Sequence, residues 1–508
     1  MEEAGERLYP KKRYSNQIDT IMNMENQRPL ITSALLLLML CNFSIGIAQS
    51  LQRPNIIVFL VDDLGYSDVG CYGSDYYETP HIDRLAKSGM RFTHAYASST
   101  LCSPTRASLL TGKNPGRLHI THAIPIQGYK RIDGGKGTYL KDADYVMNLP
   151  LEEVTIAEAL KAGGYATASI GKWHVCDDPA YYPENQGFDT NIGGNHHGHT
   201  GEYFYPYHGR WRMAEGQPWA EWNTLPDGKE GEYLTDRLTA EAVDFIERNV
   251  DKPFFLYLSH YAVHTPIQAK NDIQAHYEHK VRDSLKGHVK PAYAAMIESV
   301  DASMGAIMKK LASSGLTENT IIIFTSDNGG HGKQTSNYPF RGNKGNFYEG
   351  GIRVPLIIRW PGVTDRKLVS EAPVITTDLF PSLLDMVGLP LMPHQHRDGV
   401  SLVPVLKQKG SLSRDALYWH FPNYVGTGHP NPSAPLSVIR YHDWKLIESL
   451  EDGSLELYDL KADQRESHNL ARSNIKLAAS LQRMLEKWRS QTGVQLPEIN
   501  PAYEKAKK

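Results

Sequence analysis

The sequence has few cysteines and no excess of either charge. Four of its 508 residues are cysteine, and 54 basic against 57 acidic side chains give a formal net charge of −3. A chain with this balance is not a generally basic nucleic-acid-binding protein, so we expect no nucleic-acid partner. Low-complexity segments and solenoid-type repeats are also missing. The composition, 41% hydrophobic and 22% charged, is that of a globular protein with room for a large core and two domains.

One long apolar run lies near the N-terminus, at residues 31–48. Its last three residues, Gly-Ile-Ala, have the small-residue spacing of a signal-peptidase site, which predicts a secretory signal cleaved after Ala48. A transmembrane anchor is the alternative, because the run is long enough to span a bilayer, but Asn42 and Ser44 weaken its second half. We therefore expect an exported protein, periplasmic or extracellular, with no stable membrane insertion after cleavage.

Cleavage would leave three cysteines, Cys71, Cys102 and Cys176. An exported protein can keep a disulfide, and three cysteines allow one bridge with one thiol left over. If Cys102 is the functional cysteine, Cys71 and Cys176 are the candidate pair. Two buried free thiols are the alternative, and the sequence does not decide between the two.

Four segments are predicted to form buried strands, at 55–61, 166–170, 254–259 and 321–326. Three of them are near-continuous apolar runs, as in a sheet that is covered on both faces. Helical segments alternate with the strands, and one of them begins with the capping-box pair Thr155 and Glu158. This alternation predicts an α/β fold with a largely parallel sheet.

The pattern changes after about residue 406. Residues 437–449 and 455–463 look like short antiparallel strands, and 475–489 looks like a closing helix, which together predict a smaller α+β subdomain. The expected organisation is an N-terminal extension and signal at 1–48, a catalytic domain at 49–405 and a C-terminal subdomain at 406–508.

Acidic and amide side chains directly follow two of the predicted strands. Asp62 and Asp63 follow the first, and Asp327 and Asn328 follow the fourth. Since ligands bind beyond the carboxyl ends of strands in open α/β sheets, we expect these side chains to meet at one edge. Three carboxylates brought together without a cation would repel one another, and oxygen-only ligands suit Ca²⁺ or Mg²⁺ rather than zinc. A solvated strand end and a turn are the alternative.

Cys102 lies in the stretch "LCSPTRASLLTG". Pro104 suits the first turn of a helix, which places Cys102 at a helix N-terminus, where backbone N–H groups favour an anion. Arg106 lies about one turn further on and can point the same way. Other cationic or donor side chains expected at this edge are Lys172, His174, His264 and Lys344. A cationic pocket with a metal suits a sulfate or phosphate ester, whereas the alternative for Cys102 is a small buried core residue.

The stretch "CSPTRASLLTG" resembles the sulfatase signature, cysteine–x–proline–x–arginine with its leucine and threonine–glycine tail. Further similarity runs through "RPNIIVFLVDDLGYSDVGCYG", "GGYATASIGKWH", "HYAVHTP", "FTSDNGG" and "RGNKGNFYEGGIRVPLIIRWPG", and the ending "LYDLKADQRESHNLA" is similar to that of bacterial-type sulfatases. The resemblance implies the alkaline-phosphatase-like α/β fold, with a small C-terminal sheet domain. It also implies the activity of a sulfuric ester hydrolase.

In this family a maturation enzyme oxidises the signature cysteine to formylglycine. The resemblance therefore implies a formylglycine made from Cys102, with a formylglycine-generating enzyme as a partner. The implied metal is Ca²⁺, with Mg²⁺ as the alternative. Its implied ligands are Asp62, Asp63, Asp327, Asn328 and the converted Cys102.

The resemblance also implies catalytic roles for the cationic side chains. Arg106 and Lys172 would hold the formylglycine hydrate and the sulfate, and His174 would act on the hydrate. His264 and Lys344 would face the sulfate and the leaving oxygen, and the choice of proton donor between these two is left open.

The substrate is less clearly indicated than the reaction. Residues 181–207 are rich in aromatic, histidine and asparagine side chains, which could stack on sugars and bind hydroxyls, and a packed surface loop is the alternative. His196, His197 and Arg341 are the candidate sugar contacts. Similarity to bacterial exported polysaccharide sulfatases implies a sulfated saccharide of the galactose or N-acetylgalactosamine type. The competing functions are a phosphate or phosphonate ester hydrolase of the same fold and an inactive saccharide-binding homologue.

Overall fold

The structure is a computed structural model, and it describes residues 53–125, 137–207, 224–281, 287, 290–425 and 433–506. The predicted signal at 1–48 lies outside these residues. From Pro54 onward the chain forms one compact unit. Within the described ranges no helix is both long and apolar enough to cross a membrane.

An eight-stranded sheet forms the centre of this unit. Its order is β10-β2-β9-β8-β1-β7-β5-β6. The strands are β1 (Asn55–Val61), β2 (Met90–Phe92), β5 (Ala166–Gly171), β6 (Thr190–Ile192), β7 (Phe254–Ser259), β8 (Thr320–Ser326), β9 (Leu356–Arg359) and β10 (Leu368–Ser370). The four predicted strands are confirmed as β1, β5, β7 and β8, which are adjacent and parallel. Among the described strands of this sheet, only β9 runs against its neighbours.

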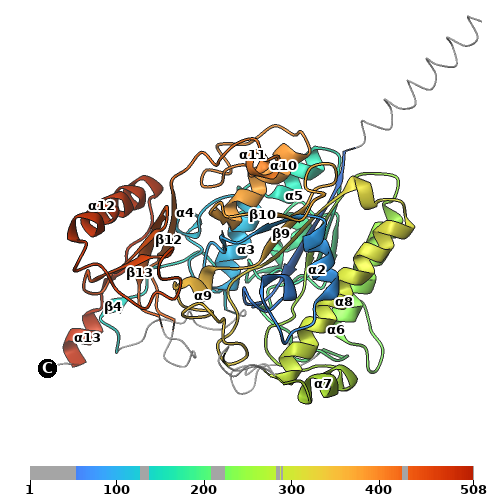
Figure 1. The fold of residues 1–508 in the computed structure, drawn as a ribbon, viewed down its shortest axis with the longest axis horizontal. Coiled ribbons are helices and arrows are strands. Elements are labelled where there is room, and N and C mark those ends of the chain that lie inside the picture. The colour runs from blue at the N-terminus through green and yellow to red at the C-terminus, as the bar shows by residue number, and fades with distance from the viewer. Residues whose placement is uncertain are drawn as a thin grey trace, which may run out of the picture. The chain divides into compact units, whose positions relative to one another are not determined.

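Successive residues of the central strand point to opposite sides, so an unbroken apolar strand places apolar side chains on both faces of the sheet. Helices cover both faces and bury these side chains. Ile57, Phe59 and Val61 belong to one buried cluster with residues of α6 and α8, and Figure 1 shows α6, α7 and α8 together on one flank. Ile56 and Val58 belong to a second cluster with residues of α3, α5 and α10. The sheet is therefore buried on both faces, as the apolar runs predicted.

The helices of this region begin and end as follows. They are α2 (Pro80–Lys87), α3 (Cys102–Thr111), α4 (Pro115–Leu118), α5 (Ile156–Ala162), α6 (Leu234–Arg248), α7 (Asn271–Glu278), α8 (Pro291–Ser313), α9 (Glu349–Ile352), α10 (Leu379–Met386) and α11 (Val403–Leu406). The capping box that predicted the start of α5 is confirmed, since Thr155 Oγ1 accepts from the Glu158 amide and the Glu158 carboxylate accepts from the Thr155 amide. Single 3₁₀ turns lie at Gly70–Tyr72, Pro179–Tyr181, Pro183–Asn185, Thr317–Asn319 and Thr376–Asp378.

A second sheet lies near the C-terminus, as the sequence predicted. It is an antiparallel meander of β12 (Ala416–Phe421), β13 (Leu436–Tyr441), β14 (Trp444–Ser449) and β15 (Leu455–Asp459). Helix α12 (Ile475–Thr492) packs on one face of this sheet, and Figure 1 shows it at the end of the unit away from α6 and α8. The remaining elements are α13 (Pro501–Ala506) and two short pairs, β3 (Ala95–Tyr96) with β11 (Val374–Ile375) and β4 (Leu140–Lys141) with β16 (Glu498–Ile499).

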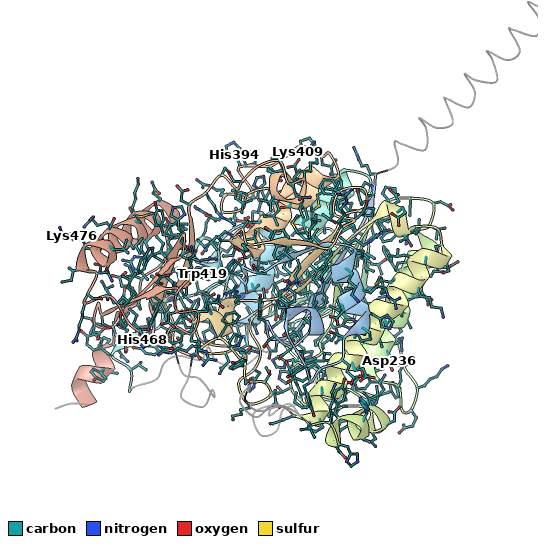
Figure 2. All side chains as sticks on the ribbon, viewed as in Figure 1. Asp236, His394, Lys409, Trp419, His468 and Lys476 are labelled. Atoms are coloured by element: carbon teal, nitrogen blue, oxygen red, sulfur yellow. The ribbon has the colours of Figure 1, made fainter. Side chains whose placement is uncertain are left out.

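The other face of the C-terminal sheet packs on the segments that lead to Cys102 and Lys344. Trp419, labelled in Figure 2, donates from its indole N–H to the Ala97 carbonyl at 2.8 Å and contacts the Tyr96 ring edge to face. The same apolar cluster contains Leu101 and Phe347. Since this contact joins the two parts into one compact unit, the division of the chain at residue 405 stays a prediction.

Candidate active site

The predicted site residues meet where the central strands end. Ligand atoms of Asp62, Asp63, Cys102 and Asp327 all lie within 4.8 Å of one another, and all four side chains are buried. The strand ends of β1 and β8 supply the three carboxylates, and the N-terminus of α3 supplies the thiol. The structure therefore brings these four side chains together at one edge of the sheet.

Cys102 is the first residue of α3. Its Sγ donates to Asp62 Oδ1 at 3.4 Å, and Lys344 Nζ lies 3.7 Å from the sulfur. Burial, with the Asp62 charge added, raises the pKa of this thiol well above its ordinary value. A thiolate and not a thiol is the nucleophilic form of cysteine, so this shift disfavours the unmodified side chain as a nucleophile.

Each of the three buried carboxylates has a buried cation as partner. Lys172 Nζ lies 2.6 Å from Asp62 Oδ2, Arg106 Nη2 lies 2.8 Å from Asp327 Oδ2, and Lys344 Nζ lies 2.8 Å from the Asp63 carboxylate. The three negative and three positive charges of these pairs balance one another, as buried ion pairs require.

The carboxylates differ in how well they are compensated. Against its burial, the Lys344 ammonium holds the pKa of Asp63 well below its usual range. Against its own burial, Asp327 has a lowered pKa because of the Arg106 guanidinium. By contrast, burial raises the pKa of Asp62 to about 7, although Lys172 opposes the rise. A further cation beside Asp62 would remove this cost of ionisation.

Asn328 provides a test of whether a metal fits here. Its Nδ2 donates to Asp63 Oδ1 at 2.8 Å, while its Oδ1 is buried and has no hydrogen-bond partner among the described residues. A buried carbonyl oxygen without a donor needs another partner, and a hard cation is one. The donor set of carboxylate and amide oxygens therefore fits Ca²⁺ or Mg²⁺.

His174 is held by a short chain of hydrogen bonds. Its Nε2 donates to the Ile124 carbonyl at 2.8 Å, and the Ile124 amide donates to Ser103 Oγ at 3.0 Å. Nδ1 is then the basic nitrogen of the neutral ring, and it has no partner within the described part of the chain. Burial and the Lys172 charge lower the pKa of His174 well below its ordinary value, which keeps the ring neutral.

His264 lies on the metal side of the site. Its Nε2 is 3.6 Å from Asp63 Oδ2, and its Nδ1 bonds the Thr265 carbonyl at 2.8 Å. Burial and Lys344 lower the pKa of His264. Asp63 in turn raises the pKa of Lys344 above its ordinary value, so the ammonium stays charged.

The three candidate sugar contacts lie in different surroundings. His196 is hydrogen-bonded to the Tyr182 hydroxyl at 2.6 Å and contacts the His197 ring at 4.3 Å between centroids. Arg341 instead donates to the Tyr458 hydroxyl and lies over the Tyr348 ring. Its guanidinium therefore ties the Lys344 segment to the C-terminal sheet, and the sugar-binding role of all three residues stays a prediction.

Sequence reasoning missed His199. This ring stacks on His264, with 5.4 Å between centroids and an interplanar angle of 9°. The signal was present, because His199 belongs to the same histidine-rich stretch as His196 and His197. The stretch was interpreted as sugar-binding, and nothing in its spacing shows which histidine reaches the strand ends.

Glycine pairs let two site-bearing segments approach closely. A side chain at Gly329 would place its Cβ 2.0 Å from the Gly350 carbonyl oxygen, and one at Gly351 would place it 1.8 Å from the Asn346 oxygen. The Gly329 amide donates to the Gly351 carbonyl at 3.0 Å. This contact brings the segment of Asn328 against that of Lys344.

The disulfide alternative is not realised. Cys71, Cys102 and Cys176, the three cysteines in the described part of the chain, are all free thiols. The sequence left this choice open, and the structure has the free-thiol alternative.

Comparison with known proteins identifies the family. The family model described as Sulfatase matches residues 54–389. The chain belongs to the sulfatase family. A second model, described as N-sulphoglucosamine sulphohydrolase, C-terminal, matches residues 342–491 of this sulfatase. The sulfatase is therefore an enzyme that hydrolyses sulfate esters, with the alkaline-phosphatase-like fold.

The relatives of this sulfatase carry the names of more than one activity. A protein named sulfatase from Formosa agariphila is 33% identical over 501 residues, covering 86% of this chain and 89% of that protein. N-acetylgalactosamine-6-sulfatase of Sus scrofa is 33% identical over 82% of this chain and 77% of its own. Steryl-sulfatase of Homo sapiens is 30% identical over 78% and 75%.

Solved structures agree with the fold. The crystal structure of Ps i-CgsB has a TM-score of 0.72 and 31% identity, covering 86% of this chain and 93% of its own. The same protein is known in complex with k-i-k-neocarrahexaose. Phosphonate monoester hydrolase of Agrobacterium radiobacter, at 21% identity and a TM-score of 0.60, shares the fold alone.

Proposed function

We propose that this sulfatase removes O-sulfate from a saccharide of the galactose or N-acetylgalactosamine type, using a formylglycine made from Cys102 and a bound Ca²⁺ or Mg²⁺. One observation carries the proposal, namely the buried thiol of Cys102 at a helix N-terminus among three buried cations and the metal-fitting oxygens. The N-acetylgalactosamine-6-sulfatase relative and the neocarrahexaose complex of Ps i-CgsB support the saccharide class. We also infer export, which rests on residues 1–48.

The metal would be held by Asp62, Asp63, Asp327 and Asn328, together with the group made from Cys102. A bound divalent cation would supply Lewis acidity and would lower the pKa of a hydroxyl beside it. The cation would also change the charge of the site. Because the three acids and three bases already cancel, two further positive charges would favour an anionic sulfate ester.

The oxidised cysteine would supply a hydrated aldehyde, with one hydroxyl to attack sulfur and a second whose deprotonation releases the sulfate. An unmodified Cys102 cannot do this, because a thiol side chain has no second hydroxyl on the same carbon whose deprotonation could expel the sulfate. The pairing of Asp62 with Lys172 and of Asp327 with Arg106 fixes both cations beside the reacting atoms before substrate arrives.

Proton transfer falls to the remaining side chains. His174 Nδ1 would accept the proton of the second hydroxyl, because the Ile124 carbonyl fixes the tautomer that leaves this nitrogen basic. His264 or Lys344 would give a proton to the leaving alcohol. The two can be separated by comparing esters with good and poor leaving groups, because a variant lacking the donor should lose rate mainly on the poor ones.

The deciding experiment is a desulfation screen with defined sulfated oligosaccharides, using protein coexpressed with a formylglycine-generating enzyme. We expect turnover on galactose- or N-acetylgalactosamine-type sulfates, with glucosamine sulfates and a steryl sulfate as contrasts. Phosphate and phosphonate esters in the same assay test the competing activity that the shared fold suggests. Faster hydrolysis of those esters, or turnover confined to the steryl sulfate, would overturn the proposal. The inactive homologue is not retained, because the family is enzymatic.

A further inference from the structure

The segment around Lys344 is anchored by a residue from the C-terminal region. The Gly350 amide donates back to the Arg341 carbonyl at 2.8 Å, which closes residues 341–350 into a loop. The Lys344 amide donates to the Gly330 carbonyl at 3.1 Å, which ties this loop to the segment that follows β8. Both ends of this loop contact Glu466, which follows β15.

Glu466 binds the two ends of the loop through different atoms. Its backbone carbonyl accepts from Arg341 Nη1 at 2.9 Å, and its Oε2 accepts from the Glu349 amide at 2.6 Å. Arg341 precedes Lys344 by three residues, and Glu349 follows it by five. One residue of the C-terminal region therefore spans the loop that presents the ammonium.

The conformation of Glu466 is unusual. It is a non-glycine residue with φ of 51°, in the left-handed region, and it is fully buried. A left-handed backbone and a buried carboxyl group each cost free energy. The surrounding contacts must therefore hold Glu466 in this conformation. Such outliers concentrate at sites where geometry is needed for function.

Buried charges hold Glu466 in place. Lys445 Nζ, from β14, lies 2.8 Å from Glu466 Oε1 and 3.1 Å from Glu349 Oε1, so one ammonium serves both carboxylates. Arg353 also pairs with Glu349, and the Tyr96 hydroxyl donates to it. The network joins β14, the Glu466 turn and α9.

We propose that Glu466 is a positioning residue of the active site, which fixes both ends of the 341–350 loop and so holds the Lys344 ammonium against Asp63 and Cys102. The inference rests on the catalytic role proposed for Lys344. It assigns to the C-terminal sheet a part in the geometry of the reaction, beyond covering the core.

The test compares three substitutions in metal-loaded protein with equal formylglycine content by mass spectrometry. Glu466→Ala removes the side-chain anchor, and Glu466→Gln keeps an acceptor for the Glu349 amide. Glu448→Ala is the matched control, because Glu448 is a buried carboxylate of the same sheet that pairs with Arg489 of α12 instead. Should Glu466→Ala not fold, Glu466→Asp shortens the same anchor.

We expect Glu466→Ala to lower kcat about tenfold or more with a smaller change in KM, because the loop would present the ammonium less accurately. Glu466→Gln should stay within about threefold of the wild type, as should Glu448→Ala. Hydrogen exchange gives a readout that does not need activity. The backbone amides of 341–350 should exchange faster in Glu466→Ala, and their exchange rates should be unchanged in Glu448→Ala.

Wild-type kcat together with unchanged exchange in Glu466→Ala would overturn the inference, and so would an equal loss of kcat in Glu448→Ala. Lys344→Met separates this result from the proposed function. If Lys344→Met loses turnover while Glu466→Ala does not, only the positioning role fails. If Lys344→Met turns over normally, the proposed role of Lys344 fails first.

Discussion

At the scale of single residues, the site depends on groups kept in one protonation state. Cys102 is kept a thiol by burial, Lys344 is kept charged by Asp63, and His174 is kept neutral with a fixed tautomer. Each state follows from one close contact or from burial. The chemistry of this site can therefore be tested by removing one atom or one bond at a time.

Replacing Cys102 tests the nucleophile. A serine has one hydroxyl and lacks the second that would expel sulfate, so Cys102→Ser should release no more than about one alcohol per active site, and Cys102→Ala none. A rapid-mixing assay with a chromogenic aryl sulfate measures this stoichiometry. Multiple turnover by either variant, or an unmodified thiol in active wild-type protein by intact mass, would contradict the role.

Ser103 offers a finer test. Ser103→Ala removes the acceptor for the Ile124 amide, whose carbonyl holds His174, so we expect kcat to fall about three- to tenfold with little change in KM. Ser108→Ala is the control, because Ser108 is buried on the same helix and its hydroxyl has no partner in the described residues. Equal kcat in both variants, at equal formylglycine content, would refute this chain of contacts.

At the scale of elements, long apolar runs were predictable and short strands were not. The strands β1, β5, β7 and β8 are apolar enough to be recognised alone. Strands β2, β9 and β10 have three or four residues, and their pairing depends on contacts far along the chain. Sequence length and pattern carry no signal for such elements.

The site residues also divide into those that the sequence could predict and those that it could not. Asp62, Asp327 and Lys172 follow recognisable strands, so their meeting could be predicted from the rule that parallel strands end at one edge. Ser103 and Glu466 could not be found in this way, because their roles come from bonds to Ile124 and Glu349, which no sequence pattern relates to them.

The charged network around Lys445 predicts a pH effect on stability. Burial raises the pKa of Glu466 from 4.5 to about 7, so its contribution to stability is fully present below about pH 4.5 and is lost as the pH rises through 7. The amide of Glu466→Gln does not titrate, so this variant does not lose that stability as the pH rises. We therefore expect Tm of this variant, relative to the wild type, to rise between pH 5 and 8, by the equivalent of about 1–3 kcal/mol. Thermal melts at fixed ionic strength measure the difference, and parallel curves would contradict it.

At the scale of the whole molecule, this chain is similar to relatives that are named for different substrates. N-acetylgalactosamine-6-sulfatase and steryl-sulfatase are both similar to this chain over more than three quarters of its length. Substrate choice must therefore come from the surroundings of the sulfate, not from the sheet that carries it. His199, in the same histidine-rich stretch as His196 and His197, stacks on His264, so we expect differences in this stretch to matter.

The packing of the C-terminal sheet predicts that residues 49–405 do not fold alone. Without residues 406–508, the buried side chains of Tyr96, Leu101 and Phe347 would lose their apolar partners. We expect the fragment to aggregate or to bind a hydrophobic dye without a cooperative melt, whereas the full chain melts cooperatively. A soluble fragment with sulfatase activity would show that the predicted boundary separates independent domains.

The burial of Cys102 also sets an order of events. The side chain is 3% exposed, and every residue of α3 is buried once the fold is complete. If Cys102 is oxidised as proposed, the oxidising enzyme would have to contact a sulfur that the folded chain covers almost completely. We therefore expect the oxidation to precede the folding of this segment.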